Sequence, residues 1–419
     1  MGILTSISRS WLTKTTKPFH FRSGENNALS FMHTPQLGLY IHIPFCRSIC
    51  SFCPYCKVLY DEELSARYIK ALLAEIDLVG KECKGQKKEV TSLYFGGGTP
   101  ALIAEDIASI IERVNTYFVI NEGIGVELHP EDCTTERLQM LKDAGVSKIS
   151  IGVQSFQPEI LKILGRDPID YDSVFKAIRQ VPFETVSVDF IFALPTQTAE
   201  SLIQDIEFAF AHGANHFAMY PFIDFTFTQR KFARQQERDK KRLLYDIVRY
   251  CEECGYHRDS IWTFSKTGRS RYSSMTRDNF LGFGCSATTL LEEQFKINTF
   301  DVEAYIRQMN QRRMATSLTL FFTKRQRMVY YLFWTLYSME LSETNFEAFF
   351  NKTLHSQYGF EMKLAKWLKL VTKDGDTYRL TTKGSYYFHY YEHFYTLSYI
   401  DQMWSLMQKQ AFPAQLIIR

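Results

Sequence analysis

Four of the nine cysteines in this 419-residue chain are clustered, at Cys46, Cys50, Cys53 and Cys56. The first three have the spacing C-x3-C-x2-C. A zinc knuckle needs four ligands, usually arranged as two pairs. Three thiolates on one loop suit a cubane iron–sulfur cluster better, because they bind three irons and leave the fourth open to a small molecule. We therefore expect Cys46, Cys50 and Cys53 to be metal ligands.

A glycine-rich segment and two acidic residues are further candidates for ligand binding. The segment consists of Gly96, Gly97, Gly98 and Thr99. Its glycines would let the backbone approach a ligand closely, and a tight strand-to-helix turn is the alternative. Glu127 lies between apolar residues, which disfavours a surface acid, and its carboxylate could hold ribose hydroxyls or an ammonium group. Asp189 lies inside an apolar run, so its carboxylate needs a partner such as Arg166, with a purely structural ion pair as the alternative.

Six short apolar runs, each followed by helical spacing, must position these residues. The runs predict strands over 37–43, 90–95, 125–128, 148–153, 186–192 and 216–222. Helices are expected over 62–79, 102–118, 135–144, 158–164, 171–178 and 199–211. This repetition implies an α/β fold with a parallel sheet. An open doubly wound sheet would suffice, but candidates follow at least five strands, and a barrel gathers strand ends around one mouth. We predict a partial (β/α)6 TIM-like barrel.

The chain divides into four expected regions. Residues 1–36 form an N-terminal extension, predicted to be flexible or loosely docked, whose basic, hydroxyl-rich composition faintly resembles a transit peptide. Residues 37–255 form the barrel and end in a long amphipathic helix over 230–254. Residues 256–310 extend the core, and they look loop-rich as far as residue 300. Residues 311–419 form a mostly helical, winged-helix-like C-terminal domain.

Composition limits the classes of partner. The net charge of +3 over 419 residues argues against a nucleic-acid-binding protein. The hydrophobic share of 45% and the charged share of 23% exclude disordered and fibrous classes. No apolar stretch reaches the length of a transmembrane helix. We expect a cytoplasmic protein that acts on a small molecule.

Several ordered motifs resemble those of one enzyme family. They are YIHIPFC over 40–46, FGGGTP over 95–100, SIGVQSF over 150–156 and DFIFALP over 189–195, with later landmarks LGFGCSA over 281–287 and LTTKG over 380–384. Together with C-x3-C-x2-C, they resemble the radical S-adenosylmethionine (SAM) superfamily. Within it they are similar to the oxygen-independent coproporphyrinogen III oxidase-like (HemN/HemW-like) branch. The resemblance covers about residues 37–390 and implies the partial barrel of the radical SAM type.

The resemblance also implies cofactors and roles. Cys46, Cys50 and Cys53 would hold a [4Fe-4S] cluster. Phe52 would pack beside the adenine of SAM, and the segment Gly96–Thr99 would receive its methionine amino group. The implied SAM pocket is lined by Glu127, Gln154, Arg166 and Asp189. Tyr40 and Glu127 are expected near the reactive centre, although Tyr40 is equally interpretable as a barrel-lining aromatic residue.

The activity implied by the resemblance is cleavage of SAM to a 5′-deoxyadenosyl radical, which takes hydrogen from a tetrapyrrole. An electron donor such as flavodoxin or ferredoxin is implied, and members of the branch often hold a second SAM. Cys56 departs from the family, because the porphyrinogen oxidase has its fourth cysteine two positions after the third rather than three. Two alternatives therefore stay open: a radical SAM methyltransferase acting on an aromatic heterocycle, and a haem-binding chaperone that retains the cluster.

Overall fold

Six parallel strands form the centre of the molecule. The computed structural model describes residues 3–24, 29–229, 232, 235–266 and 278–418. The strands are β2 (Leu37–Ile43), β6 (Leu93–Gly97), β8 (Ile124–Leu128), β9 (Lys148–Gln154), β10 (Thr185–Phe192) and β11 (His216–Pro221). Each pairs in parallel with the next in chain order. Because β11 pairs onward with β13 and β2 with β14, the sheet stays open between its first and sixth strands. The predicted partial barrel is confirmed.

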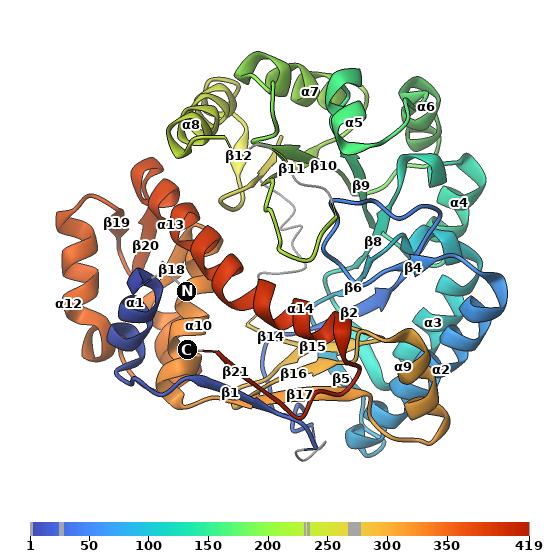
Figure 1. Ribbon diagram of the computed structural model, residues 1–419, viewed down its shortest axis with the longest axis horizontal. Helices are drawn as coiled ribbons and strands as arrows, with labels where there is room; N and C mark the ends of the chain where they lie inside the picture. Colours follow the sequence, from blue (N-terminus) through green and yellow to red (C-terminus); the bar gives the residue numbers. More distant parts are fainter. Residues whose placement is uncertain (1–2, 25–28, 230–231, 233–234, 267–277, 419) are drawn as a thin grey trace.

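Helices cover the outside of this sheet (Figure 1). They are α2 (Glu62–Gly80), α3 (Ala104–Tyr117), α4 (Thr135–Asp143), α5 (Pro158–Leu164), α6 (Tyr171–Gln180), α7 (Ala199–Ala211) and α8 (Glu237–Glu253). Side-chain caps explain several of their starts: Asp61 accepts a hydrogen bond from the Leu64 amide, and Thr198 forms a capping box with Ser201. The helix α8 begins later than the predicted residue 230, and residues 230, 231, 233 and 234 lie outside the described part.

The described part of the segment after α8 contradicts the loop-rich prediction, and residues 267–277 lie outside it. It forms β12 (His257–Arg258), β13 (Thr263–Ser265), β14 (Asn279–Phe283), β15 (Thr288–Leu290) and β16 (Gln294–Asn298). The strand β14 runs parallel to β2, and β15, β16 and β17 (Thr316–Phe321) continue the sheet antiparallel. The strands β12 to β16 are two to five residues long, and Gly282 lies within β14, so their alternation is hard to see in the sequence. Buried and partly exposed residues alternate along β14, as in a strand with one covered face.

The N-terminal extension is anchored rather than loosely docked. Its helix α1 (Ile3–Thr13) lies beside α10 (Lys324–Tyr337), and the Arg325 Nε donates to the Leu12 carbonyl at 3.0 Å. Its strand β1 (Phe19–Arg22) pairs with both β17 and β21 (Gln415–Ile418). The two ends of the described chain therefore meet at one edge of the sheet (Figure 1).

The C-terminal region has the predicted winged-helix-like character. After α10 come β18 (Glu340–Ser342), α11 (Glu343–Phe350), α12 (Leu354–Trp367), β19 (Val371–Asp374), β20 (Thr377–Leu380), α13 (Thr382–Tyr395) and α14 (Asp401–Lys409). The three strands form a separate antiparallel sheet. The buried side chains of Leu341, Phe346 and Tyr358 belong to an apolar cluster of its own. In Figure 1 the helices α13 and α14 run from this region back across the barrel. Among the described helices, none is long and apolar enough to span a membrane.

Candidate functional site

Polar candidates occupy the accessible positions of otherwise buried strands. Tyr40 is the partly exposed residue of β2, between Leu39 and Ile41, which are 2% and 0% exposed. Glu127 is the partly exposed residue of β8, and Asp189 is one of two in β10. Because helices cover the outer face, these three side chains lie on the inner face of the partial barrel.

The three predicted metal ligands lie on one loop beside this inner face. Cys46 ends β3 (Phe45–Cys46), which pairs with β4 (Val58–Leu59), so both ends of the loop are held together. All three cysteines are half-buried free thiols. Within the described ranges, their sulfur atoms do not form a group compact enough for a single metal ion. A loop that presents three separated thiols suits a cluster of several metal atoms better than one ion.

A buried acid anchors this loop to the end of β8. Arg47 donates to one Asp132 carboxylate oxygen through its Nε at 3.2 Å and its Nη2 at 2.7 Å, and Arg137 pairs with the same oxygen. Asp132 is fully buried, so two arginines compensate the cost of burying its charge. Sequence analysis missed this anchor, although an arginine inside the cysteine loop was a visible signal.

The glycine-rich segment approaches the cysteine loop closely. The Thr99 amide donates to the Phe45 carbonyl at 2.7 Å, and the Thr99 hydroxyl lies 4.0 Å from the Cys46 sulfur. A Cβ atom on Gly98 would lie 2.5 Å from that carbonyl oxygen and 3.0 Å from the Cys46 sulfur. Gly97 has a φ of +119°, which residues with a side chain rarely adopt. Glycine is therefore required at both positions.

Glu127 supports the glycine-rich segment. One of its carboxylate oxygens accepts a hydrogen bond from the Gly97 amide at 3.0 Å, and the other accepts one from the Tyr94 hydroxyl at 3.0 Å. Burial raises the pKa of Glu127, and these hydrogen bonds oppose the rise. The Tyr94 contribution was missed, because nothing in the sequence distinguishes this tyrosine from a core aromatic residue.

Arg166 joins the cysteine loop to the end of β9. Its Nη1 donates to the Gly152 carbonyl at 2.5 Å, and its Nη2 lies 3.8 Å from the Cys50 sulfur. The guanidinium carbon lies 5.7 Å from the centre of the Phe52 ring. The Nε is buried and has no hydrogen-bond partner. A buried donor without a partner is a position that a bound ligand would satisfy.

The partner expected for Asp189 is wrong. Its carboxylate accepts a hydrogen bond from Ser150 at 2.9 Å, and among the described residues no ion pair joins it to Arg166. The reason is that Arg166 reaches Gly152 and Cys50 instead. Burial raises the pKa of Asp189 to about 7, the charge of Glu127 adds to the rise, and the Ser150 hydrogen bond opposes it. Among the described residues, neither Asp189 nor Glu127 forms an ion pair with a lysine or an arginine, so the inner face is suited to a cationic ligand.

The remaining candidates border the same space. Gln154 ends β9 with a φ of +73°, a strained backbone conformation of the kind found at binding sites. Phe52 packs with apolar residues that include Leu164 on α5. The Tyr40 hydroxyl lies 3.1 Å from the His42 Nδ1, and burial raises the Tyr40 pKa well above its ordinary value, so the hydroxyl stays protonated.

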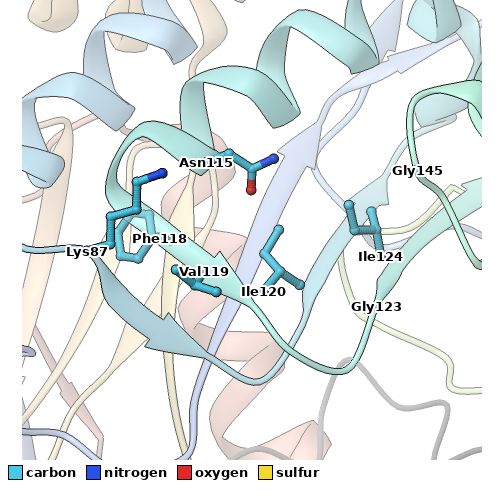
Figure 2. A pocket seen from close by; sticks show the side chains of 8 residues that line it. All are labelled: Lys87, Asn115, Phe118, Val119, Ile120, Gly123, Ile124 and Gly145. Atoms are coloured by element: carbon cyan, nitrogen blue, oxygen red, sulfur yellow. The ribbon is translucent and has the colours of Figure 1, made fainter.

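A surface hollow lies away from these residues (Figure 2). It is lined by Phe118, Val119, Gly123 and Ile124, among others. Gly123 and Ile124 lie at the start of β8, whereas Glu127 lies near its end. The hollow therefore opens at the opposite end of the strand, and none of the predicted site residues lines it.

Comparison with known proteins identifies the family. Residues 40–209 match the radical SAM superfamily. The haem chaperone HemW of Lactococcus lactis is 31% identical over 271 residues, which cover 60% of this chain and 69% of that protein. The chain belongs to the radical SAM superfamily. Within it, this radical SAM protein belongs to the branch of HemN and HemW.

Two more relatives and one solved structure of that branch are similar to this chain. HemW of Bacillus subtilis is 29% identical over 283 residues, covering 64% of this chain and 74% of that protein. The oxygen-independent coproporphyrinogen III oxidase of Helicobacter pylori is 30% identical over 266 residues, covering 59% of this chain and 58% of that enzyme. The structure of HemN from Escherichia coli superposes with a TM-score of 0.71 at 21% identity, covering 85% of this chain and 88% of HemN, which shows a shared fold.

Membership of the superfamily implies a [4Fe-4S] cluster and SAM. The residues present fit both groups. The loop offers three free, separated thiols, and Thr99 and Arg166 are placed to donate to two of the sulfurs. The Asp189 carboxyl group and the Arg166 Nε, which has no hydrogen-bond partner, suit the positive charge and the carboxylate of SAM.

Proposed function

We propose that this radical SAM protein is an oxidoreductase that cleaves SAM at a [4Fe-4S] cluster held by Cys46, Cys50 and Cys53 and acts on a tetrapyrrole. One observation carries the proposal: two hydrogen-bond donors from separate parts of the barrel approach sulfur atoms of the cysteine loop. Thr99 approaches the Cys46 sulfur, and Arg166 approaches the Cys50 sulfur. Hydrogen bonds to ligand sulfurs are a means by which proteins set the reduction potential of a cluster.

The bound cofactors would supply one-electron cleavage of SAM and hence a carbon radical able to abstract hydrogen. The chain's own residues position the reactants. Glu127 holds the glycine-rich segment in place for the methionine end of SAM, and Asp189 offers a carboxylate to its positive charge. The Arg166 Nε remains available to a ligand oxygen. The protonated Tyr40 hydroxyl, aligned by His42, would contact the substrate side of the site.

A group of aromatic rings around Trp404 of the C-terminal helix supports a flat, apolar substrate. Trp404 on α14 lies 5.7 Å from Tyr55 of the cysteine loop and 5.8 Å from Phe225, with the latter rings nearly parallel. Such rings exclude water and can stack on a conjugated macrocycle. The named activity of the Helicobacter pylori relative supports a porphyrinogen as substrate.

The test is turnover of the reconstituted protein under strictly anaerobic conditions, with SAM, a reductant and coproporphyrinogen III. We expect 5′-deoxyadenosine, methionine and a decarboxylated porphyrinogen, while the carboxylate leaves as carbon dioxide and the electron left after hydrogen abstraction passes to an added one-electron acceptor. Cys50→Ala should abolish all three products, whereas Cys83→Ala, which changes a buried cysteine away from the loop, should leave them unchanged. Absence of 5′-deoxyadenosine from a cluster-loaded protein would disprove the proposal.

A haem chaperone is the second candidate, because the Bacillus subtilis and Lactococcus lactis relatives carry that name. It predicts stoichiometric haem binding, without product formation from the porphyrinogen. The same assay separates the methyltransferase alternative, for which S-adenosylhomocysteine would accumulate together with 5′-deoxyadenosine.

A further inference from the structure

A second group of side chains of types that can bind metals lies next to the end of the cysteine loop. It comprises His42 on β2, Cys56 after the loop and Cys285 in the turn between β14 and β15. All three side chains are buried, and their ligand atoms lie within 4.8 Å of one another. Among the described residues, this is the one compact group of three such ligands. We propose that His42, Cys56 and Cys285 bind a single thiophilic metal ion, of which Zn²⁺ is the representative.

The distance between the sulfur atoms fits one ion. The Cys56 and Cys285 sulfurs lie 3.8 Å apart. Two thiolates bound to one tetrahedral zinc ion at about 2.3 Å are about 3.8 Å apart as well. A disulfide would need the sulfurs at about 2.05 Å, so the observed spacing matches a bridging cation more closely than a covalent bond.

The third ligand, His42, has a polar neighbour at each ring nitrogen. Its Nδ1 lies 3.1 Å from the Tyr40 hydroxyl, and its Nε2 lies 2.9 Å from the Cys56 carbonyl oxygen, which it contacts as an N–H donor. Binding of an ion through Nε2 would take the other tautomer, in which Nδ1–H donates to the Tyr40 oxygen, as is usual for ligating histidines. The Cys56 thiol donates to the Phe300 carbonyl at 3.1 Å, and it would give up that proton on binding the ion.

The turn that carries Cys285 is built to reach this point. The Tyr68 hydroxyl donates to the His42 carbonyl at 2.7 Å and accepts from the Cys285 amide at 3.0 Å, so one side chain ties two ligand-bearing elements together. Gly284 has a φ of +97°, and a Cβ there would lie 2.4 Å from the Tyr68 hydroxyl and 2.6 Å from the His42 carbonyl oxygen. The fold therefore brings together and holds three ligands that are far apart in the sequence.

The proposal is independent of the cluster chemistry. A cation here would fasten the end of the cysteine loop to both β2 and the β14–β15 turn. The metal alone, Zn²⁺, is the probe. We would reconstitute the full chain with its cluster, add Zn²⁺, remove weakly bound ions with a mild chelator, and measure zinc per chain together with zinc X-ray absorption.

The expected result is about one zinc per chain, with two sulfur neighbours at about 2.3 Å and one imidazole nitrogen. Cys285→Ala should lower retained zinc about tenfold or more, and Cys83→Ala should not. The triple variant Cys46→Ala, Cys50→Ala, Cys53→Ala should keep the zinc while losing the cluster, which separates this proposal from the proposed function.

Three outcomes would overturn the proposal. They are no zinc retained by the unaltered chain, a zinc site with three or four sulfur neighbours, and a peptide mass showing a Cys56–Cys285 disulfide. The absorption spectrum of the unaltered chain decides the question even where Cys285→Ala fails to fold.

Discussion

Asp189 and Glu127 are the acidic side chains that face the inner side of the barrel at the proposed SAM pocket. Glu127 accepts hydrogen bonds from the Gly97 amide and the Tyr94 hydroxyl, whereas Asp189 accepts one from Ser150. The charge of Glu127 adds to burial in raising the pKa of Asp189 to about 7. The two acids therefore differ in role: one shapes the loop, and the other offers charge to a ligand.

The raised pKa of Asp189 leads us to expect that SAM binding depends on pH. Below pH 7 the free protein holds this carboxyl protonated, and a cationic ligand must displace the proton. We expect SAM affinity to rise about tenfold between pH 6 and pH 8, and Asp189→Asn to bind SAM weakly with no such rise. Anaerobic titration calorimetry measures both. The same slope in Asp189→Asn would show that another group titrates.

Glu127 predicts a graded loss in SAM binding. Glu127→Ala removes two hydrogen bonds to a charged group, each contributing about 1.5–3 kcal/mol, and frees Gly97. We expect the affinity for SAM to fall about 10- to 100-fold. In Tyr94→Phe, which removes one of the two bonds, the affinity should fall less. Equilibrium dialysis checks the order. Equal effects of the two variants would contradict the supporting role.

At the scale of elements, the C-terminal helix α14 closes one side of the site. Asp401 at its start accepts hydrogen bonds from the Thr226 amide and hydroxyl, both at 2.7 Å. The Gln408 amide, near its end, lies 3.4 Å from the Pro54 carbonyl of the cysteine loop. A helix from the end of the chain thus contacts both the loop and the segment after β11.

This contact predicts that α14 protects the cluster. Asp401→Ala removes both bonds to Thr226 and leaves the start of the helix held by the apolar contacts of Met403 and Trp404. In air, the visible absorption of the cluster should decay several-fold faster than in the unaltered protein, because oxygen and water reach the loop. Lys409→Ala, at the exposed end of the same helix, is the matched control. Equal decay rates in all three proteins would rule out a protective role.

At the scale of the whole molecule, Glu75 joins the barrel to its extension. This fully buried acid on α2 accepts hydrogen bonds from the Gly284 amide at 2.6 Å, the Tyr305 hydroxyl at 2.7 Å and the Asn298 amide at 2.8 Å. Burial raises its pKa from 4.5 to about 7, and the hydrogen bonds oppose the rise. The folded protein therefore binds a proton here more tightly than the unfolded chain does.

The sign of the resulting pH effect follows directly. The favourable contribution of protonated Glu75 is fully present below pH 4.5 and is lost as the pH rises through 7. Between pH 5 and pH 8 this group should lower the free energy of unfolding by about 2 kcal/mol. Glu75→Gln should lack that part of the decline, and Glu63→Gln, exposed on the same helix, should retain it. Denaturant unfolding at the two pH values measures the difference.

The amino-acid sequence by itself determined the features that depend on local order. Alternating apolar runs and helical spacing predicted the six strands and the helices between them, since both periodicities arise within one element. The spacing of Cys46, Cys50 and Cys53 predicted a common loop. The short strands after α8 escaped prediction, because β13, β14 and β16 pair with β11, β2 and β17, which lie elsewhere in the chain, and strand formation depends on such neighbours.

Only the tertiary structure decided the partners across the chain. Asp189 meets Ser150 rather than Arg166, Asp132 anchors the cysteine loop, and Cys56 lies beside Cys285, which is 229 positions away. Such contacts depend on the pairing of neighbouring strands, on the turn with positive φ at Gly284 and on the side-chain conformation of each arginine. These are properties of packing, and residue order along one segment does not contain them.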